Sequence, residues 1–255
     1  MKLVILAGGL GTRLAEETEV RPKPMVEVGE KPILWHIMKY YSCFGINDFI
    51  ICLGYKGFVI KEFFKNYFLH SSDVTFDLRT GSQTLHSNDT ESWKVTLVNT
   101  GDATSTAGRI KRISKYINEG DFCLTYGDGL SNVNIYKTIE FHKLHNKLVT
   151  LTAVLPSGRF GALKLENNLV NNFKEKPQGD GLWTNGGFMI LKSEIFKNIK
   201  DDSVSLESDL LPQLATNGEV IAFKHDDFWQ PMDTVRDKNI LKDLWDSGKA
   251  PWKIW

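Results

Sequence analysis

Apolar residues along this chain follow two alternating patterns. Short runs that are rich in β-branched and aromatic residues, and bounded by glycine, proline or polar residues, predict buried strands. These runs are residues 3–7, 49–53, 122–126 and 149–155. Between them, apolar residues recur every three or four positions, which predicts amphipathic helices. The helical segments are residues 33–44, 59–68 and 134–146. This alternation predicts an α/β fold with a mostly parallel central sheet covered by helices on both faces.

Two stretches interrupt the alternation. Residues 73–100 are largely polar and predict an inserted strand pair with a mobile tip. Residues 156–192 contain short segments of alternating polarity, which predict a small antiparallel lobe. A helical tail is expected over residues 234–255. Because no linker or repeat separates these parts, we expect residues 1–255 to form one domain with inserted lobes.

A glycine-rich loop follows the first strand directly. Its residues are Gly8, Gly9, Gly11, Thr12 and Arg13. Glycine lets the backbone turn sharply and approach a ligand closely, and backbone N–H groups at the start of a helix attract phosphate. Arg13 and Lys23, the latter between two prolines, add positive charge. These features together predict a polyphosphate site.

Other readings of the loop fit less well. A dinucleotide-binding loop needs Gly-x-Gly-x-x-Gly, whereas the spacing here is Gly8-Gly9-x-Gly11. A Walker-type loop needs Gly-Lys-Ser/Thr, which does not follow these glycines. A plain tight turn between strand and helix remains the alternative for the glycines alone, and the two cations favour phosphate binding.

Two aspartates are candidate metal ligands. Asp128 lies between glycines at the end of the strand predicted at residues 122–126, and Asp233 follows a Trp-Gln-Pro-Met segment. Since ligands of such sheets bind at the carboxyl ends of the strands, the glycine loop and Asp128 should share one site. The alternatives are that Asp128 shapes a turn and that Asp233 caps the helix predicted over residues 235–245.

The composition narrows the class of protein. Lys plus Arg and Asp plus Glu number 31 each, so no net charge favours nucleic acid or a membrane surface. No apolar run approaches the roughly 18 residues that span a bilayer. Cys43, Cys52 and Cys123 lie in apolar contexts without metal-binding spacing, which predicts buried, reduced thiols. We therefore expect a cytoplasmic protein that binds neither nucleic acid nor membrane.

Several motifs resemble those of the sugar-phosphate nucleotidyltransferases, in order and over nearly the whole chain. They read GGLGTRL, RPKPMVEVGEKPIL, TYGDG, EKP, NGGF and FWQPMDTVRDK. Within that family the chain is most similar to the cytidylyltransferases that act on glucose 1-phosphate. The resemblance implies a Rossmann-like domain with an antiparallel acceptor-binding lobe, transfer from CTP to a phosphorylated acceptor with release of pyrophosphate, and a Mg²⁺ cofactor. It also implies a role in cell-surface polysaccharide or capsule synthesis and a homo-oligomer, trimeric or hexameric.

The resemblance also assigns roles to individual residues. Arg13, Lys23 and Asp128 are expected to be catalytic, and Asp128 and Asp233 to hold the metal ion. The nucleotide-binding residues would be Leu6, Ala7, Gly8, Gly9, Gly11, Thr12, Arg13, Lys23, Thr104, Arg109 and Asp128. The acceptor-binding residues would be Gly161, Glu175, Lys176, Asn185 and Gly186.

The sequence departs from the family pattern at three places. Ala107 stands where relatives usually have glycine, which adds a Cβ near the expected nucleotide. The segment after Glu207 lacks the usual proline and Trp183 precedes the Asn-Gly-Gly motif, and both of these departures are expected to flank the acceptor pocket. The expected acceptor is α-D-glucose 1-phosphate. Another sugar phosphate, or a non-sugar such as phosphoglutamine, remains an alternative. Two further hypotheses are a catalytically silent nucleotide-binding protein of the same fold and a nicotinamide-dependent oxidoreductase, which the glycine spacing disfavours.

Overall fold

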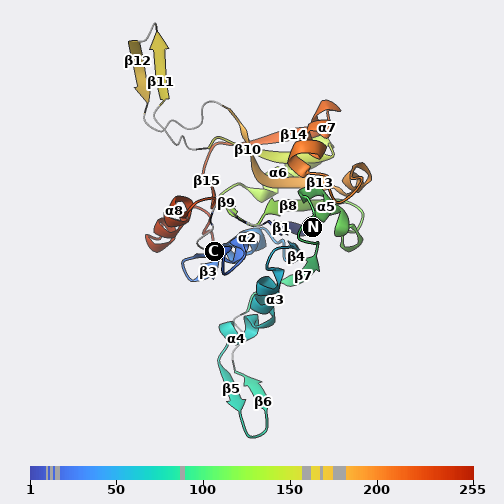
Figure 1. Ribbon diagram of the computed structural model, residues 1–255, viewed down its shortest axis with the longest axis vertical. Helices are drawn as coiled ribbons and strands as arrows, with labels where there is room; N and C mark the ends of the chain where they lie inside the picture. Colours follow the sequence, from blue (N-terminus) through green and yellow to red (C-terminus); the bar gives the residue numbers. More distant parts are fainter. Residues whose placement is uncertain are drawn as a thin grey trace.

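The computed structural model describes residues 1–9, 11, 14, 18–86, 90–156, 162–166, 169–174 and 182–255, and only the backbone of 162–166 and 169–174. Seven strands form a central sheet in the order β14-β10-β13-β8-β1-β4-β7 (Figure 1). Their bounds are β1 Leu3–Ala7, β4 Asp48–Leu53, β7 Lys94–Asn99, β8 Asp121–Tyr126, β10 Val149–Val154, β13 Thr184–Lys192 and β14 Val220–His225. Neighbours run parallel except at β13, which is antiparallel to β8 and β10. The mostly parallel α/β fold is confirmed.

Both faces of the sheet are buried. Successive side chains of a strand point to opposite faces, and β1 shows this directly. Leu3, Ile5 and Ala7 pack into the apolar cluster that includes residues of α2 and α8. Val4 and Leu6 pack into a second cluster, with residues of α5 and α7. Burial on both faces explains why the central strands are continuous apolar runs in the sequence.

Helices connect the strands and cover the sheet. They are α2 Ile33–Ser42, α3 Gly57–Lys65, α4 Tyr67–Ser71, α5 Thr106–Arg112, α6 Ile135–His145, α7 Leu211–Thr216 and α8 Val235–Asp246. Short 3₁₀ turns span Lys23–Met25, Ser114–Tyr116 and Ser193–Asn198, and a π-helical turn spans Leu206–Leu210. The segment predicted as one helix over 59–68 is divided at Asn66, whose backbone leaves the helical region.

Short antiparallel pairs complete the fold. They are β2 Glu27–Val28 with β3 Lys31–Pro32, β5 Val74–Asp77 with β6 Ser82–Leu85, β9 Gly129–Ser131 with β15 Trp229–Pro231, and β11 Ala162–Glu166 with β12 Leu169–Lys174. The hairpin β5–β6 extends from the body beyond α3 and α4, and β11–β12 lies at the opposite end of the molecule (Figure 1).

The two inserted stretches contribute more to the sheet than their sequence pattern indicates. Within residues 73–100, β7 pairs in parallel with β4 as the edge strand of the central sheet. Within residues 156–192, β13 lies between β8 and β10. The strands that form separate hairpins are therefore β5–β6 and β11–β12. An edge strand with one half-exposed face alternates in polarity just as a surface hairpin does, which explains the grouping of β7 with its neighbouring hairpin. Strand β13 is buried over most of its length, and its place in the central sheet depends on pairing with β8 and β10.

The chain after β15 packs back onto the domain. Trp252 is fully buried and stacks on Phe228, with ring centroids 5.6 Å apart. Trp245 forms an edge contact with the buried His36, with centroids 4.6 Å apart. The tryptophan-rich end thus fills a place in this chain's own core.

The cysteines differ in part from the expectation. Cys52 and Cys123 are buried, whereas Cys43, expected to be buried, is exposed because it lies at the solvent-facing end of α2. In the described part of the chain, none of the helices is both long and apolar enough to cross a bilayer.

Candidate active site

The carboxyl ends of β1 and β8 border a cavity of about 470 Å³. It lies where the two strands, paired in parallel, give way to the glycine loop and to the Gly127-Asp128 turn. The sequence-predicted residues that line it are Leu6, Ala7, Gly8, Gly9, Gly11, Lys23, Thr104, Arg109, Asp128 and Asp233. The structure therefore brings together most of the predicted nucleotide and metal residues. Thr12 and Arg13 lie outside the described residues.

Glycine is required at two positions of the loop. A Cβ on Gly8 would lie 2.2 Å from Nη1 of Arg109. Gly11 has a φ of +65°, and its Cβ would lie 2.8 Å from Cγ2 of Thr18. Larger residues would therefore displace the loop or its support. At Gly9, by contrast, an added Cβ meets nothing within 4 Å.

Arg109 is buried, with 5% exposure, and its guanidinium packs against Gly8 of the glycine loop. Its guanidinium donates to five oxygens, namely Gly8 O (3.1 Å), Leu53 O (3.3 Å), Thr100 Oγ1 (2.8 Å), Gly101 O (2.7 Å) and Asp102 O (3.2 Å). All five belong to neutral groups, and burial lowers the pKa of Arg109. Arg109 thus ties together the loops that follow β1, β4 and β7. Direct contact of Arg109 or Thr104 with a nucleotide stays a prediction.

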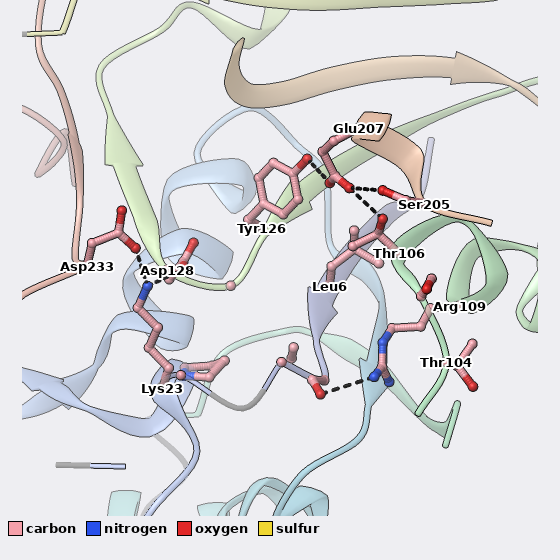
Figure 2. A pocket seen from close by; sticks show the side chains of 17 residues that line it. Leu6, Lys23, Thr104, Thr106, Arg109, Tyr126, Asp128, Ser205, Glu207 and Asp233 are labelled. Atoms are coloured by element: carbon pink, nitrogen blue, oxygen red, sulfur yellow. Dashed lines mark hydrogen bonds and ion pairs between the residues drawn. The ribbon is translucent and has the colours of Figure 1, made fainter. Parts of the chain in front are cut away.

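Lys23 bridges the two predicted metal ligands (Figure 2). Its Nζ donates to Asp128 Oδ2 at 2.6 Å and to Asp233 Oδ1 at 2.7 Å. Pro22 and Pro24 flank Lys23 in the 3₁₀ turn and restrict its backbone. Burial opposes the charged form of Lys23, but attraction to the two carboxylates outweighs it and raises the pKa above its ordinary value. The ammonium is therefore charged at neutral pH.

A strand pair brings the two aspartates together. Strand β9 follows Asp128, strand β15 precedes Asp233, and the two strands are antiparallel. The backbone N–H of Met232 also donates to Asp128 O at 2.8 Å. The N-cap of α8 is Thr234, whose hydroxyl accepts from the N–H of Asp237, so the capping alternative for Asp233 does not hold.

The two carboxylates fit a hard divalent ion. Both place an oxygen within 2.7 Å of one cationic nitrogen, which shows that they converge on a single positive charge. Among the described residues, no three His, Cys, Asp or Glu side chains are grouped for metal binding. Mg²⁺ commonly takes only one or two protein carboxylates and completes its shell with water and substrate phosphate oxygens. The donor set suits Mg²⁺ on that basis.

A second cavity of about 260 Å³ adjoins the first. Asn185 and Gly186, both predicted to bind the acceptor, line it. A Cβ on Gly186 would lie 2.7 Å from Cγ1 of Val154, so the backbone packs closely there. Three other predicted acceptor residues, Gly161, Glu175 and Lys176, lie outside the described residues.

The sequence reasoning missed several polar residues of the cavity wall. Tyr126, Thr106, Ser205 and Glu207 line the larger cavity, and the hydroxyls of the first three donate to the Glu207 carboxylate. A signal was present for Tyr126, the last residue of a strand that ends at the site. Glu207 lies 81 residues further on, in a turn whose position the sequence pattern does not reveal.

Comparison with known proteins yields one family and several full-length relatives. The family model described as "Nucleotidyl transferase" matches residues 2–237. Glucose-1-phosphate cytidylyltransferase of Salmonella typhi is 57% identical over 100% of both chains. The probable glucose-1-phosphate cytidylyltransferase of Bacillus subtilis is 41% identical, again over 100% of both chains.

The fold has a solved counterpart. The crystal structure of HddC from Yersinia pseudotuberculosis superimposes with a TM-score of 0.71 and 27% sequence identity, covering 96% of this chain and 99% of the other. The fold of this chain is therefore a known architecture.

Proposed function

This chain belongs to the nucleotidyl transferase family, and we propose that it transfers the cytidylyl group of CTP to α-D-glucose 1-phosphate, forming CDP-glucose and pyrophosphate. The observation that carries the proposal is the Lys23–Asp128–Asp233 cluster on the wall between two adjoining cavities. The larger cavity, with the glycine loop, suits the triphosphate. The smaller, with Asn185 and Gly186, suits the acceptor.

The chemistry requires charge control more than proton transfer. The acceptor phosphate is already ionised, so its oxygen attacks the α-phosphorus without a general base, and the bond to the β-phosphate oxygen breaks. The main obstacle is that two anions must approach each other. Charged groups that the fold holds in position can offset the repulsion between these anions, because positioning and preorganised charge dominate phosphoryl transfer.

The residues of the cluster divide this task. Lys23 holds a protonated ammonium in the wall of the larger cavity, between the two aspartates that also line the smaller one, and would bind the phosphates on which negative charge accumulates. Asp128 and Asp233 would hold Mg²⁺, which neutralises phosphate charge when it is bound. Backbone groups of the glycine loop would bind the nucleotide, together with Arg13 and Thr12. Members of this family generally use a divalent metal, and Mg²⁺ is the ion that we propose here.

The identity of the phosphorylated acceptor has alternatives. Another sugar phosphate or a phosphorylated non-sugar would use the same nucleotide cavity, because the proposed roles of Lys23, Asp128 and Asp233 involve only phosphate groups and the metal ion. We also propose a homo-oligomer, trimeric or hexameric, and a role in supplying activated sugar for cell-surface polysaccharide. A catalytically silent nucleotide-binding protein is the remaining alternative.

The test is pyrophosphate release with Mg²⁺, each of the four common ribonucleoside triphosphates, and a panel of phosphorylated acceptors. Turnover with CTP and glucose 1-phosphate is expected. Asp128→Asn and Asp233→Asn should each abolish it and leave the circular dichroism spectrum unchanged. Asp201→Asn is a matched control, because the Asp201 carboxylate accepts from the N–H and the hydroxyl of Ser203 and borders neither cavity. Wild-type rates in the Asp128 or Asp233 variant would contradict the assignment, and CTP turnover with another acceptor would move the proposal to that acceptor.

A further inference from the structure

Tyr126 occupies a position that the reaction described above does not explain. Three residues line both cavities, namely Tyr126, Asp128 and Asp233. The two aspartates converge on Lys23. Tyr126 forms the remaining part of this common wall, at the end of β8. Its ring therefore lies where a bound nucleotide and a bound acceptor would meet.

The hydroxyl of Tyr126 is held by one carboxylate. It donates to Glu207 Oε1 at 2.5 Å. The other oxygen of Glu207 accepts from Thr106 Oγ1 at 2.6 Å and from Ser205 Oγ at 3.0 Å. Figure 2 shows the three hydroxyl groups around Glu207, away from the Lys23 cluster. Glu207 thus joins β8, the first residue of α5 and the π-helical turn.

These bonds fix the direction of the hydroxyl protons. A hydroxyl group has one proton to donate and lone pairs that accept. Thr106 donates to Glu207 and accepts from the N–H of Leu206 at 2.7 Å, so its orientation is determined. Tyr126 donates its one hydroxyl proton to Glu207, so its oxygen can only accept further hydrogen bonds. Asn185, which lines the smaller cavity, is a hydrogen-bonding neighbour of the same hydroxyl.

The ring of Tyr126 is also confined on another side. Gly187 has a φ of +80°, and a Cβ added there would lie 2.5 Å from Cδ2 of the Tyr126 ring. The ring therefore packs directly on the backbone of β13, the strand that carries Asn185 and Gly186. With its hydroxyl tied to Glu207 and its ring against Gly187, Tyr126 is held at both ends.

We propose that Glu207 is a positioning residue: through Tyr126 and Thr106 it aligns the acceptor cavity with the nucleotide cavity. Removing its carboxylate would release the tyrosine hydroxyl on one side and the start of α5 on the other. This inference rests on the proposed function, because it assumes that one substrate occupies each cavity.

The arrangement also defines what Tyr126 can recognise. Because its oxygen offers lone pairs, its partner in a ligand must be a hydrogen-bond donor. A sugar hydroxyl is such a donor, whereas an ionised phosphate only accepts. A ligand hydroxyl at the boundary of the two cavities would therefore meet an accepting oxygen, which Glu207 holds in place.

The experiment compares steady-state kinetics of wild type, Glu207→Gln, Glu207→Ala, Tyr126→Phe and the double variant Glu207→Ala/Tyr126→Phe. Glu207→Ala and Tyr126→Phe should each lower kcat/KM for glucose 1-phosphate about tenfold, the loss expected from one hydrogen bond in a desolvated site. The KM for CTP should stay within about threefold. Because Glu207 acts through Tyr126, adding Glu207→Ala to Tyr126→Phe should cost less than about threefold more. Glu207→Gln keeps an acceptor oxygen and should be milder than Glu207→Ala.

A matched control is Asp201→Asn, which also removes a carboxylate that accepts a hydroxyl proton (from Ser203, at 2.6 Å) and lines neither cavity. It should keep wild-type kinetics. Wild-type kinetics in both Glu207 variants would overturn the inference, as would fully additive losses in the double variant. A loss confined to the KM for CTP would overturn it too, since Glu207 would then be a nucleotide ligand. Absence of turnover by the wild-type protein with any acceptor would overturn the proposed function, and this inference with it.

Discussion

Replacing Lys23 by methionine separates its two roles, as the cation that pairs Asp128 with Asp233 and as a phosphate ligand. Methionine keeps the length and packing of the chain and removes the charge. Losing one partner of a buried ion pair costs about 3–5 kcal/mol. Here the two carboxylates retain 31% and 26% exposure, so water can solvate them in part. We expect Lys23→Met to lower the free energy of unfolding by about 2 kcal/mol without metal, equivalent to a fall in Tm of about 4–8 °C.

Magnesium should reverse much of this loss. In the wild-type protein a metal ion competes with the Lys23 ammonium for both carboxylates, and in the variant it does not. A ligand that binds only the folded state raises stability according to its affinity. The rise in Tm on adding Mg²⁺ should therefore be larger in Lys23→Met than in wild type, as measured by differential scanning fluorimetry. Turnover should fall by about 10²–10³, the effect of losing one preorganised charge contact.

The control is Lys39→Met, which breaks a half-buried ion pair to Glu91 (2.7 and 2.8 Å) outside both cavities. It should lower Tm with no added response to Mg²⁺ and no loss of turnover. Equal Mg²⁺ responses in wild type and Lys23→Met would refute the idea that lysine and metal compete. A loss of turnover below tenfold would show that Lys23 is not a catalytic contact.

Two further predictions concern stability. Burial lowers the pKa of His36 to about 4 from 6.5, so the unfolded chain takes up this proton at a higher pH than the folded chain does. Stability is then present above pH 6.5 and is lost as the pH falls toward 4, by up to about 3 kcal/mol. Urea titrations should show this loss, and an equal pH dependence in His36→Leu would contradict it. Gly8→Ala should cost about 2 kcal/mol because its Cβ meets the Arg109 guanidinium, whereas Gly9→Ala should cost far less. Similar Tm values for Gly8→Ala and Gly9→Ala would contradict the view that the room for a Cβ at each position determines the cost.

The sequence pattern predicted most of the central sheet, for a physical reason. Strands buried on both faces must be apolar at every position, and residues 3–7, 49–53 and 122–126 are read directly as β1, β4 and β8. Strands β7 and β13 were grouped with the inserted lobes. Their places in the sheet depend on pairing with partners distant in sequence, which local periodicity does not record.

Residues of the candidate site could be predicted where a charged side chain stands next to a local feature that is recognisable in the sequence. Lys23 lies between prolines and Asp128 directly after a buried strand, so both could be singled out from the sequence. Arg109 lines the cavity, and its contact with the nucleotide stays a prediction; the sequence did not indicate that its guanidinium also donates to oxygens at the ends of three strands, β1, β4 and β7. Glu207 could not be predicted, since its role depends on a turn packing against Tyr126 from 81 residues away.

The pairing of β9 with β15 has a consequence for the newly made protein. Asp128 and Lys23 leave the ribosome early, but the second carboxylate comes from Asp233, beyond β15. Strands β13 and β14 of the central sheet and the buried Trp252 also come from the second half of the chain. A chain that ended before Asp233 would therefore lack the second proposed metal ligand together with part of its core, so the proposed activity requires nearly the whole chain.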